Sequence, residues 1–314
     1  MGYIYDLHEK KRRRITLNGL FYAAISSASF GFSPLFSIAL LALGLNNFDI
    51  LSYRWLTAAA VLILYSQVKK KSLKLLSFDE IWKVILLSAL RALTSITLLI
   101  GYANIASGIA STINFMYPVI VTLCMMLFFG EKVSWVNILG VITAVLGVYL
   151  MASADGLQVE GGNTKLGLIC SIISAFSFAA YYICLQKTKA DKIESTKFTS
   201  WMSLFSAFYF FAGSLIFDGQ MVRFVTEGRL WLYILGLGLW ATMISNFAGV
   251  KAVRRIGPTL TSILGALQPL TAVLLGILFL GEHIGSKTIV GIILILVAVI
   301  VIVVHQQKMH AKEH

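Results

Sequence analysis

The residue with the clearest potential for chemistry is Arg91, a cation inside a long apolar stretch. It falls about nine residues into the stretch 82–103, which is roughly 14 Å along a helix. Near the centre of a bilayer an arginine costs about 2.5–3.5 kcal/mol on insertion scales, so its side chain should face a water-filled cavity or a polar partner. Two roles stay open. Arg91 either anchors the carboxylate or phosphate of a bound molecule, or donates to free carbonyls and to Tyr or Ser hydroxyls.

Two prolines lie inside long apolar stretches, and each follows a residue that can form hydrogen bonds. Pro118 follows Tyr117, and Pro269 follows Gln268. A proline within a helix leaves the carbonyl four residues earlier without its usual donor, which for Pro118 is the carbonyl of Asn114. Such a kink can flex during a conformational change and expose carbonyls to a cavity, or it can be static and serve helix packing.

Three further charged residues lie near the ends of apolar stretches. Arg54 is about one and a half turns into the stretch 48–67, from which snorkelling to the membrane interface is easy, so we expect a structural or gating role. Glu131 and Glu282 each close an apolar stretch. We expect each carboxylate to cap the start of the next helix, with a gate at opposite membrane faces as the alternative.

Residues for contact with a bound molecule can be selected from these groups and from the aromatic side chains. We choose Arg91, Asn114, Tyr117, Trp240 and Gln268 as contacts, Pro118 and Pro269 for conformational change, and Arg54, Glu131 and Glu282 for gating. Further candidates for a cavity wall are Phe32, Tyr102, Phe178, Tyr181, Tyr182, Trp201 and Asn246.

The placement of the remaining reactive residues argues against catalysis. None of the 14 acidic residues lies in the middle of an apolar stretch, and all five histidines fall in loops or tails. The three cysteines have no metal-ligand spacing, and the chain has no phosphate-binding Walker loop. We therefore expect no catalytic residue, no metal and no cofactor, so the chain is not expected to be an enzyme. A proton relay through a buried carboxylate is not expected either.

Composition and patterning indicate an all-α integral membrane protein. The 314 residues are 58% hydrophobic and 13% charged, and the mean hydropathy is +0.84. Charge this sparse cannot cover a soluble surface. Apolar runs without period-two alternation predict helices, each of about 20 residues where it crosses the bilayer. We expect ten, at about 17–40, 48–67, 82–103, 107–129, 135–153, 166–185, 199–217, 230–250, 259–280 and 286–304.

Basic residues predict the orientation of these spans. With the N-terminus in the cytoplasm, 20 of the 26 Lys and Arg lie on the cytoplasmic side, four lie outside and two lie within spans. This bias favours cytoplasmic termini in a bacterial-type inner (plasma) membrane. It also explains the net charge of +12 by contact with anionic membrane lipids, so no nucleic-acid partner is expected.

The sequence also contains an internal duplication at a distance of 151 residues. The spacing of Pro118, Gly130-Glu131 and Gly140 recurs as Pro269, Gly281-Glu282 and Gly291. Five spans in each half make the second copy enter the membrane from the opposite side. We expect two inverted-topology five-helix repeats around a central cavity, over 1–155 with a cytoplasmic tail at 1–16, and over 156–314 with a cytoplasmic tail at 305–314.

These motifs resemble the EamA-type family of the drug/metabolite transporter superfamily. The residues that carry the resemblance are Tyr117-Pro118 through Phe129-Gly130-Glu131 with Gly140 and Gly147, Gln268-Pro269 through Leu280-Gly281-Glu282 with Gly291, and Arg54 in Ser52-Tyr53-Arg54-Trp55. The resemblance implies a cavity lined by helices of both halves, with the fifth and tenth helices at the periphery. It also implies export of metabolites, amino acids or drugs.

Together these features predict an alternating-access secondary transporter that exports a small polar or anionic metabolite, such as an amino acid or a related compound. An exchanger of phosphorylated or nucleotide-linked sugars is an alternative within transport, and a passive channel or a membrane scaffold is an alternative of another class. Gly140, Ala144 and Gly147 form a small-residue face in the fifth span. This face is expected to pack either a second protomer, giving a homodimer, or a neighbouring helix.

Overall fold

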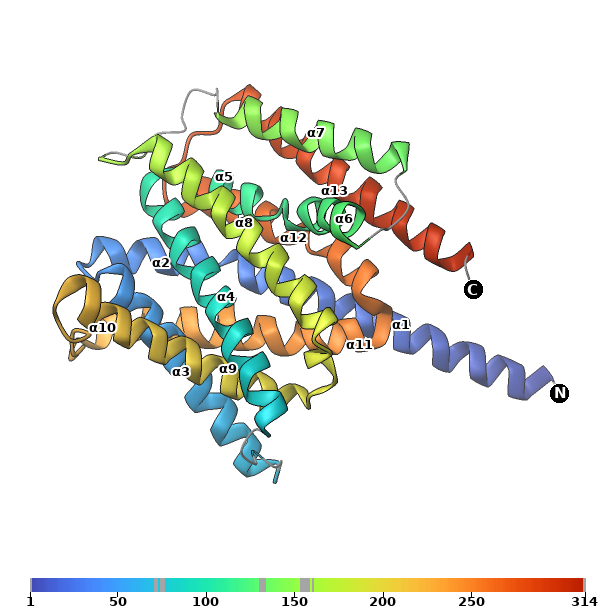
Figure 1. The fold of residues 1–314 in the computed structure, drawn as a ribbon, viewed down its shortest axis with the longest axis horizontal. Helices are drawn as coiled ribbons and strands as arrows, with labels where there is room; N and C mark the ends of the chain where they lie inside the picture. The colour runs from blue at the N-terminus through green and yellow to red at the C-terminus, as the bar shows by residue number, and fades with distance from the viewer. Residues whose placement is uncertain are drawn as a thin grey trace.

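The structure is a computed structural model that describes residues 2–70, 73, 77–129, 134–152, 159 and 161–312. Its architecture is all-helical, as the sequence predicts (Figure 1). The α-helices are α1 (Gly2–Gly31), α2 (Ser33–Ala42), α3 (Asn47–Val68), α4 (Phe78–Asn104), α5 (Ser107–Asn114), α6 (Tyr117–Phe128), α7 (Trp135–Ala152), α8 (Thr164–Lys187), α9 (Ser195–Gly213), α10 (Gly228–Leu235), α11 (Ser245–Leu264), α12 (Leu267–Phe279) and α13 (Ser286–Lys312). A 3₁₀ turn, η1 (Ala190–Lys192), and two π-helical segments, η2 (Ser214–Asp218) and η3 (Gly236–Ile244), complete the order.

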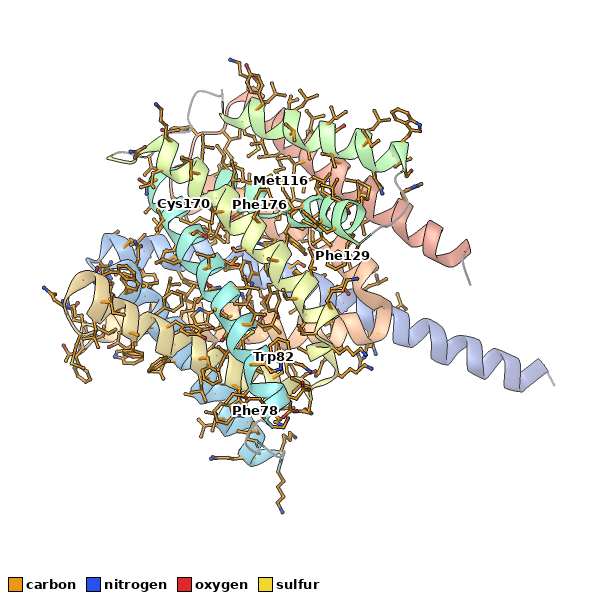
Figure 2. The ribbon with its side chains drawn as sticks, viewed as in Figure 1. Phe78, Trp82, Met116, Phe129, Cys170 and Phe176 are labelled. Atoms are coloured by element: carbon orange, nitrogen blue, oxygen red, sulfur yellow. The ribbon has the colours of Figure 1, made fainter. Side chains whose placement is uncertain are left out.

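Length and composition make this a multi-pass membrane protein. Within the described residues, eight helical segments are long and apolar enough to cross a bilayer, and two shorter apolar helices cover Trp135–Met151 and Leu267–Phe279. Large apolar side chains are exposed on the outside of the bundle, among them Phe78, Trp82 and Phe176 (Figure 2). In water such a surface would be an association hazard, whereas in a bilayer it faces lipid tails.

Prolines break the helices that the sequence predicts as kinked. The helix ends before Phe115 and restarts at Tyr117, so that Pro118 occupies the first turn of α6. Pro269 likewise lies in the first turn of α12, after a break at residues 265–266. Proline suits a first turn because the N–H that it lacks would have no helical partner there. Pro34 follows the same rule at the start of α2.

The predicted ninth span differs most from the structure. We expected a single helix over about 259–280, but α11 continues from the end of the eighth predicted span through Leu264, and only α12 follows it. The expected repeat boundary at 155/156 and Glu131 lie outside the described residues.

Long helices that are distant in sequence lie side by side. The most extensive pairings are α1 with α11, α4 with α8, α3 with α9, and α7 with α13. Figure 1 shows α7 and α13 together along one edge, and both chain ends at the same side of the view. The core between the central helices is apolar and includes fully buried Trp55 and Phe115.

The small-residue face of α7 packs against α13 of the same chain. A Cβ added to Gly147 would lie 2.8 Å from the Gly291 carbonyl oxygen and 2.8 Å from Ile295 Cγ1. A Cβ on Gly140 would meet Ile302 at 2.5 Å, and Ala144 between them is fully buried. The sequence left two partners open for this face, a second protomer or a neighbouring helix. In the structure the face contacts the neighbouring helix α13, because glycine lets the two backbones approach closely.

Enlarging Gly147 should therefore destabilise the protein. A Gly147→Leu variant inserts a side chain where the α13 backbone already lies, and overpacking of this kind costs about 1–3 kcal/mol or more. We expect a lower thermal unfolding midpoint in detergent. The matched control is Leu146→Ala, because the neighbouring Leu146 is 52% exposed on the lipid-facing side. An unchanged midpoint for Gly147→Leu would contradict the packing described above.

Candidate functional site

A cavity of about 420 Å³ lies between helices from both halves of the sequence. Its walls come from α1, α4, α6 and α8, and from α9, α11 and α12, with one end at the α8–α9 connection that contains η1. The lining combines aromatic side chains with hydroxyl and amide groups and one cation, Arg91. Its volume falls within the usual range for small-molecule sites, about 300–1,000 Å³.

Arg91 lies in the interior of α4, and its guanidinium packs against aromatic rings. Its Cζ lies 4.7 Å from the centre of the Phe178 ring, 5.4 Å from that of Tyr181 and 5.8 Å from that of Trp55. The whole residue is only 5% exposed. Attraction between a cation and the ring faces offsets part of the cost of burial, and it fixes the position of the guanidinium at the cavity wall.

The charge of Arg91 has no counter-ion in the described part of the chain. No hydrogen-bond acceptor or carboxylate for Arg91 is found among the described residues, and none of the residues that line the cavity is acidic. Among the described residues no carbonyl or hydroxyl accepts from Arg91, so these leave its donors available to an anion, which is one of the two roles that the sequence leaves open.

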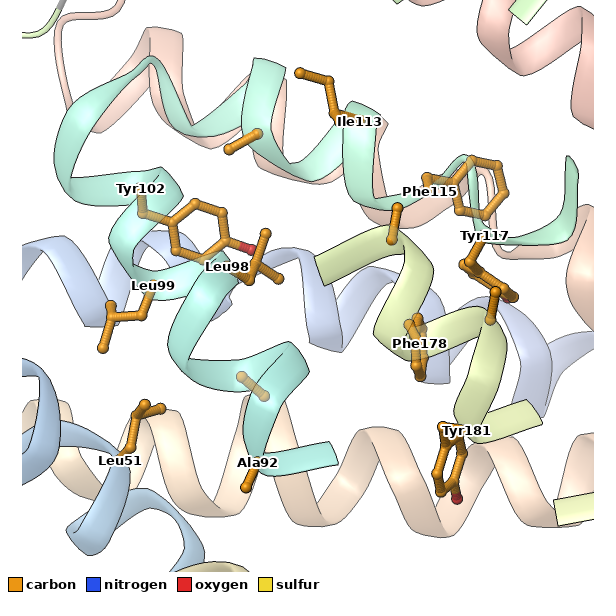
Figure 3. Close-up of a cluster of buried hydrophobic side chains, with 14 of the residues drawn as sticks. Leu51, Ala92, Leu98, Leu99, Tyr102, Ile113, Phe115, Tyr117, Phe178 and Tyr181 are labelled. Atoms are coloured by element: carbon orange, nitrogen blue, oxygen red, sulfur yellow. The ribbon is translucent and has the colours of Figure 1, made fainter. Parts of the chain in front are cut away.

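Aromatic side chains form a continuous wall beside Arg91. The ring centres of Tyr117 and Phe178 lie 4.6 Å apart, and the rings of Tyr117 and Tyr182 are stacked at 5.1 Å. Tyr181 lies 5.4 Å from Tyr182 and 6.0 Å from Phe178. Figure 3 shows Phe178 and Tyr181 projecting from α8, with Tyr117 approaching from the start of α6. These rings give the cavity an apolar surface that holds its shape.

The polar part of the lining comes mostly from α1, α11 and α12. Gln268 is 8% exposed, and its Nε2 has no hydrogen-bond partner in the described part of the structure. Ser26 and Ser245 also line the cavity, and each hydroxyl donates to the backbone carbonyl of the other residue, at 2.7 and 2.8 Å. Their donors are therefore used in joining α1 to α11, whereas the amide of Gln268 keeps a donor for a bound molecule.

Three of the five predicted contacts meet at this cavity, namely Arg91, Tyr117 and Gln268. Asn114 lies outside the wall, buried, with its Nδ2 donating to Ser174 Oγ at 3.0 Å. Trp240 is 47% exposed and packs edge-on against Phe32 at 6.1 Å, also away from the wall. Of the wider aromatic and polar set, the cavity includes Phe178, Tyr181, Tyr182 and Asn246.

Arg54 does not snorkel to the membrane interface, which corrects the expectation from sequence. It is 5% exposed; its Nε donates to Thr242 Oγ1 at 2.8 Å and its Nη1 to Ser33 Oγ at 3.1 Å. The expectation of snorkelling was based on one helix alone, whereas in the structure the π-helical segment η3 brings Thr242 to the guanidinium. Thr242 lies 151 residues after Arg91 in the sequence, so the equivalent position of the second half binds the other buried arginine. Arg54 thus joins α3, α2 and η3.

Glu282 caps a helix, but not the next one in the sequence. Its two carboxylate oxygens accept hydrogen bonds from the backbone N–H groups of Ser107, at 2.7 Å, and Gly108, at 3.3 Å. These groups begin α5, whose own preceding residue provides no side-chain cap. A carboxylate here satisfies free N–H groups and complements the helix dipole. Gly276 makes room for it, because a Cβ there would overlap the carboxylate of Glu282.

Sequence reasoning missed the serines of the wall, Ser26, Ser27 and Ser245. Small polar residues on α1 and α11 were the available signal. Single serines are also common in packed membrane helices, so that signal has little specificity.

A bundle of apolar helices around a polar cavity with a buried arginine is the architecture of a multi-pass membrane transport protein. The chain belongs to the EamA-like transporter family, whose sequence profile matches residues 17–153 and again residues 165–304. The resemblance that the sequence motifs suggest is therefore confirmed.

The chain is also similar to curated relatives in sequence and to a solved structure in fold. Protein PecM of Dickeya dadantii is 24% identical over 229 residues, which cover 71% of this chain and 73% of PecM. The uncharacterized transporter YetK of Bacillus subtilis is 22% identical over 257 residues, which cover 81% of this chain and 78% of YetK. A crystal structure with 14% sequence identity shares the fold, with a TM-score of 0.63 over 95% of this chain and 99% of the other.

Proposed function

We propose that this protein is a secondary transporter that exports a small polar or anionic metabolite by alternating access through the cavity at Arg91. The observation that carries this proposal is a buried guanidinium without a counter-ion among the described residues, at the wall of a cavity shared by both halves of the sequence. A cation at membrane depth is costly, and its retention in such a cavity is typical of a binding site for transported anions.

The proposed architecture is ten spans in two inverted five-helix repeats, with both termini cytoplasmic in the inner membrane. The duplicated motifs and the two matches of the family profile support it. The packing is consistent with a two-fold relation between the halves. The pairing of α4 with α8 corresponds to the pairing of α11 with α1. The contact of α9 with α4 corresponds in the same way to the contact of α3 with η3. The two shorter apolar helices, α7 and α12, stand at the positions of the fifth and ninth spans.

In this topology the structure corresponds to a conformation that is closed on the outer side. The cavity reaches the α8–α9 connection, which is cytoplasmic in the proposed orientation. On the opposite side, Asp49 Oδ1 accepts from the backbone N–H of Arg223 at 2.8 Å, and the Tyr53 hydroxyl donates to the Arg223 carbonyl at 2.8 Å. The Glu282 cap on α5 lies on the same side. The breaks before Pro118 and Pro269 are the points at which we propose that the helices flex.

Export of an anion needs no proton relay in this scheme. An inside-negative membrane favours the exit of a monoanion by about 2.3 kcal/mol per 100 mV. The metabolite gradient of the cell supplies further driving force. Strict dependence of transport on protons would contradict this part of the proposal.

The proposal is tested by metabolite profiling of cells with and without the protein, followed by flux of the highest-ranked compound in proteoliposomes. Saturable flux supports a carrier. Unsaturable flux would indicate a channel, and the absence of flux for every profiled compound would indicate a scaffold. A counterflow assay separates the exchanger of phosphorylated or nucleotide-linked sugars, which requires substrate on the opposite side, from a uniporting exporter.

A further inference from the structure

We propose that the cavity selects a carboxylate with an aromatic or apolar body and no ammonium group. This inference rests on the proposed function, because it names the substrate class of that transporter. The proposed function allows any small polar or anionic metabolite, which includes amino acids. The class proposed here is narrower, because it excludes ordinary zwitterionic amino acids as preferred substrates.

The charges of the wall support the first part of the proposal, which is a substrate with a carboxylate and no ammonium group. Arg91 is the charged residue that lines the cavity within the described chain, and it is 95% buried without a partner carboxylate there. Leaving such a charge unpaired is costly, and a planar carboxylate can accept two parallel N–H groups from one guanidinium. The ammonium group of an amino acid would find no carboxylate in the described wall.

A second buried cation strengthens the preference for anions. The Cζ atoms of Arg54 and Arg91 lie 5.9 and 5.8 Å from the ring centre of Trp55. The hydrogen bonds of Arg54 to Thr242 and Ser33 hold it outside the cavity wall, so it acts on a bound molecule through its field and not through contact. Two positive charges in a medium of low dielectric constant attract a carboxylate and repel an ammonium group.

The aromatic side chains of the wall support the second part of the proposal, which is the aromatic or apolar body of the substrate. Tyr117, Phe178, Tyr181 and Tyr182 surround the Arg91 side of the cavity with ring centres 4.6–6.0 Å apart. Ring surfaces of this kind bind a flat apolar body by offset or edge-on contact. The faces of Phe178 and Tyr181 already hold the guanidinium of Arg91, so they are not free to hold an ammonium group in the same way.

Gln268 completes the site with a neutral group. Its Nε2 is buried and has no partner within the described structure, although the residue lines the cavity. An amide N–H donates to a carboxylate and adds no negative charge to the wall. The free donor is therefore consistent with an anion.

Three probes with the same hydroxyphenyl ring test the inference, because they differ in charge. They are 4-hydroxyphenylacetate, an anion; tyrosine, a zwitterion; and tyramine, a cation. Binding of each to the full chain in lipid nanodiscs is measured by isothermal titration calorimetry. We expect the anion to bind at least about tenfold more tightly than tyrosine, and tyramine to bind most weakly. Equal or tighter binding of tyrosine or tyramine, or binding of none of the three, would overturn the inference.

Variants separate the role of the wall from general effects of charge. Arg91→Gln should weaken binding of the anion by about thirtyfold or more and remove the preference over tyrosine. Gln268→Glu should weaken it more than Gln268→Leu, because the new carboxylate competes for Arg91. The matched control is Arg229→Gln, since this arginine is exposed at the start of α10 and does not line the cavity. Anion binding that survives both Arg91→Gln and Gln268→Glu would contradict the site.

Flux measurements keep this inference distinct from the proposed function. If the anion binds with the expected pattern but no compound shows saturable flux, the site stands and the transport proposal fails. If a zwitterion or a cation shows saturable flux and the anion does not, transport stands and the substrate class proposed here is wrong.

Discussion

Replacing Arg91 with glutamine should abolish saturable transport and leave the helical bundle folded. The variant loses the charge and the paired donors that hold a substrate anion, an interaction worth about 2–5 kcal/mol when one partner of a buried charge pair is removed. Folding should be preserved, because in the empty protein the guanidinium contributes an unpaired buried charge among the described residues. Flux of the profiled metabolite in proteoliposomes and the thermal unfolding midpoint measure the two effects separately.

A conservative variant and a control variant help to interpret the result for Arg91→Gln. Arg91→Lys keeps the charge but loses the planar pair of donors, so we expect reduced but measurable transport. Arg229→Gln, at an exposed position at the start of α10, should transport at the original rate. Full transport by a folded Arg91→Gln variant would show that the substrate does not use this guanidinium.

Replacing Glu282 with glutamine should loosen the side of the bundle that lies outside the cell in the proposed orientation. Glu282 accepts from two backbone N–H groups at the start of α5, and hydrogen bonds to a charged group contribute about 1.5–3 kcal/mol. Loss of about 1.4 kcal/mol from the closed conformation changes the ratio of open to closed molecules tenfold. A cysteine at Ser111, which is 1% exposed on α5, should then react about tenfold faster with an impermeant maleimide added outside the cell.

The experiment uses a background in which Cys124, Cys170 and Cys184 are replaced by alanine. Glu227→Gln is the matched control, because Glu227 is an exposed carboxylate whose contact with Arg223 is long, at 3.8 Å. An equal rate of labelling with Glu282 and with glutamine at this position would mean that the cap does not hold the outer side closed.

The sequence predicts Arg91, Tyr117 and Gln268 at the cavity because each conflicts with its surroundings. A cation at membrane depth and polar residues beside a helix-breaking proline are costly in lipid, so they indicate a cavity from one segment alone. The all-helical membrane fold follows from composition for the same reason. These inferences need no knowledge of which helices are neighbours.

Features that depend on neighbouring helices could not be predicted in this way. Arg54 is buried because η3 supplies Thr242 from 188 positions further along the chain. Glu282 caps α5 in the other half of the sequence, where we expected it to cap the helix that follows. The pairing of α11 with α1 likewise joins the two halves of the sequence, and no local pattern specifies it.

The central claim is that a single cavity, shared by both halves, opens to one side of the membrane at a time. The most direct test is the reactivity of a cysteine at Asn246, which lines the cavity, in the same cysteine-free background. We predict rapid reaction with an impermeant maleimide from the side that carries the termini, slow reaction from the opposite side, and protection by bound 4-hydroxyphenylacetate. Equally rapid reaction from both sides, or no reaction from either, would contradict the account.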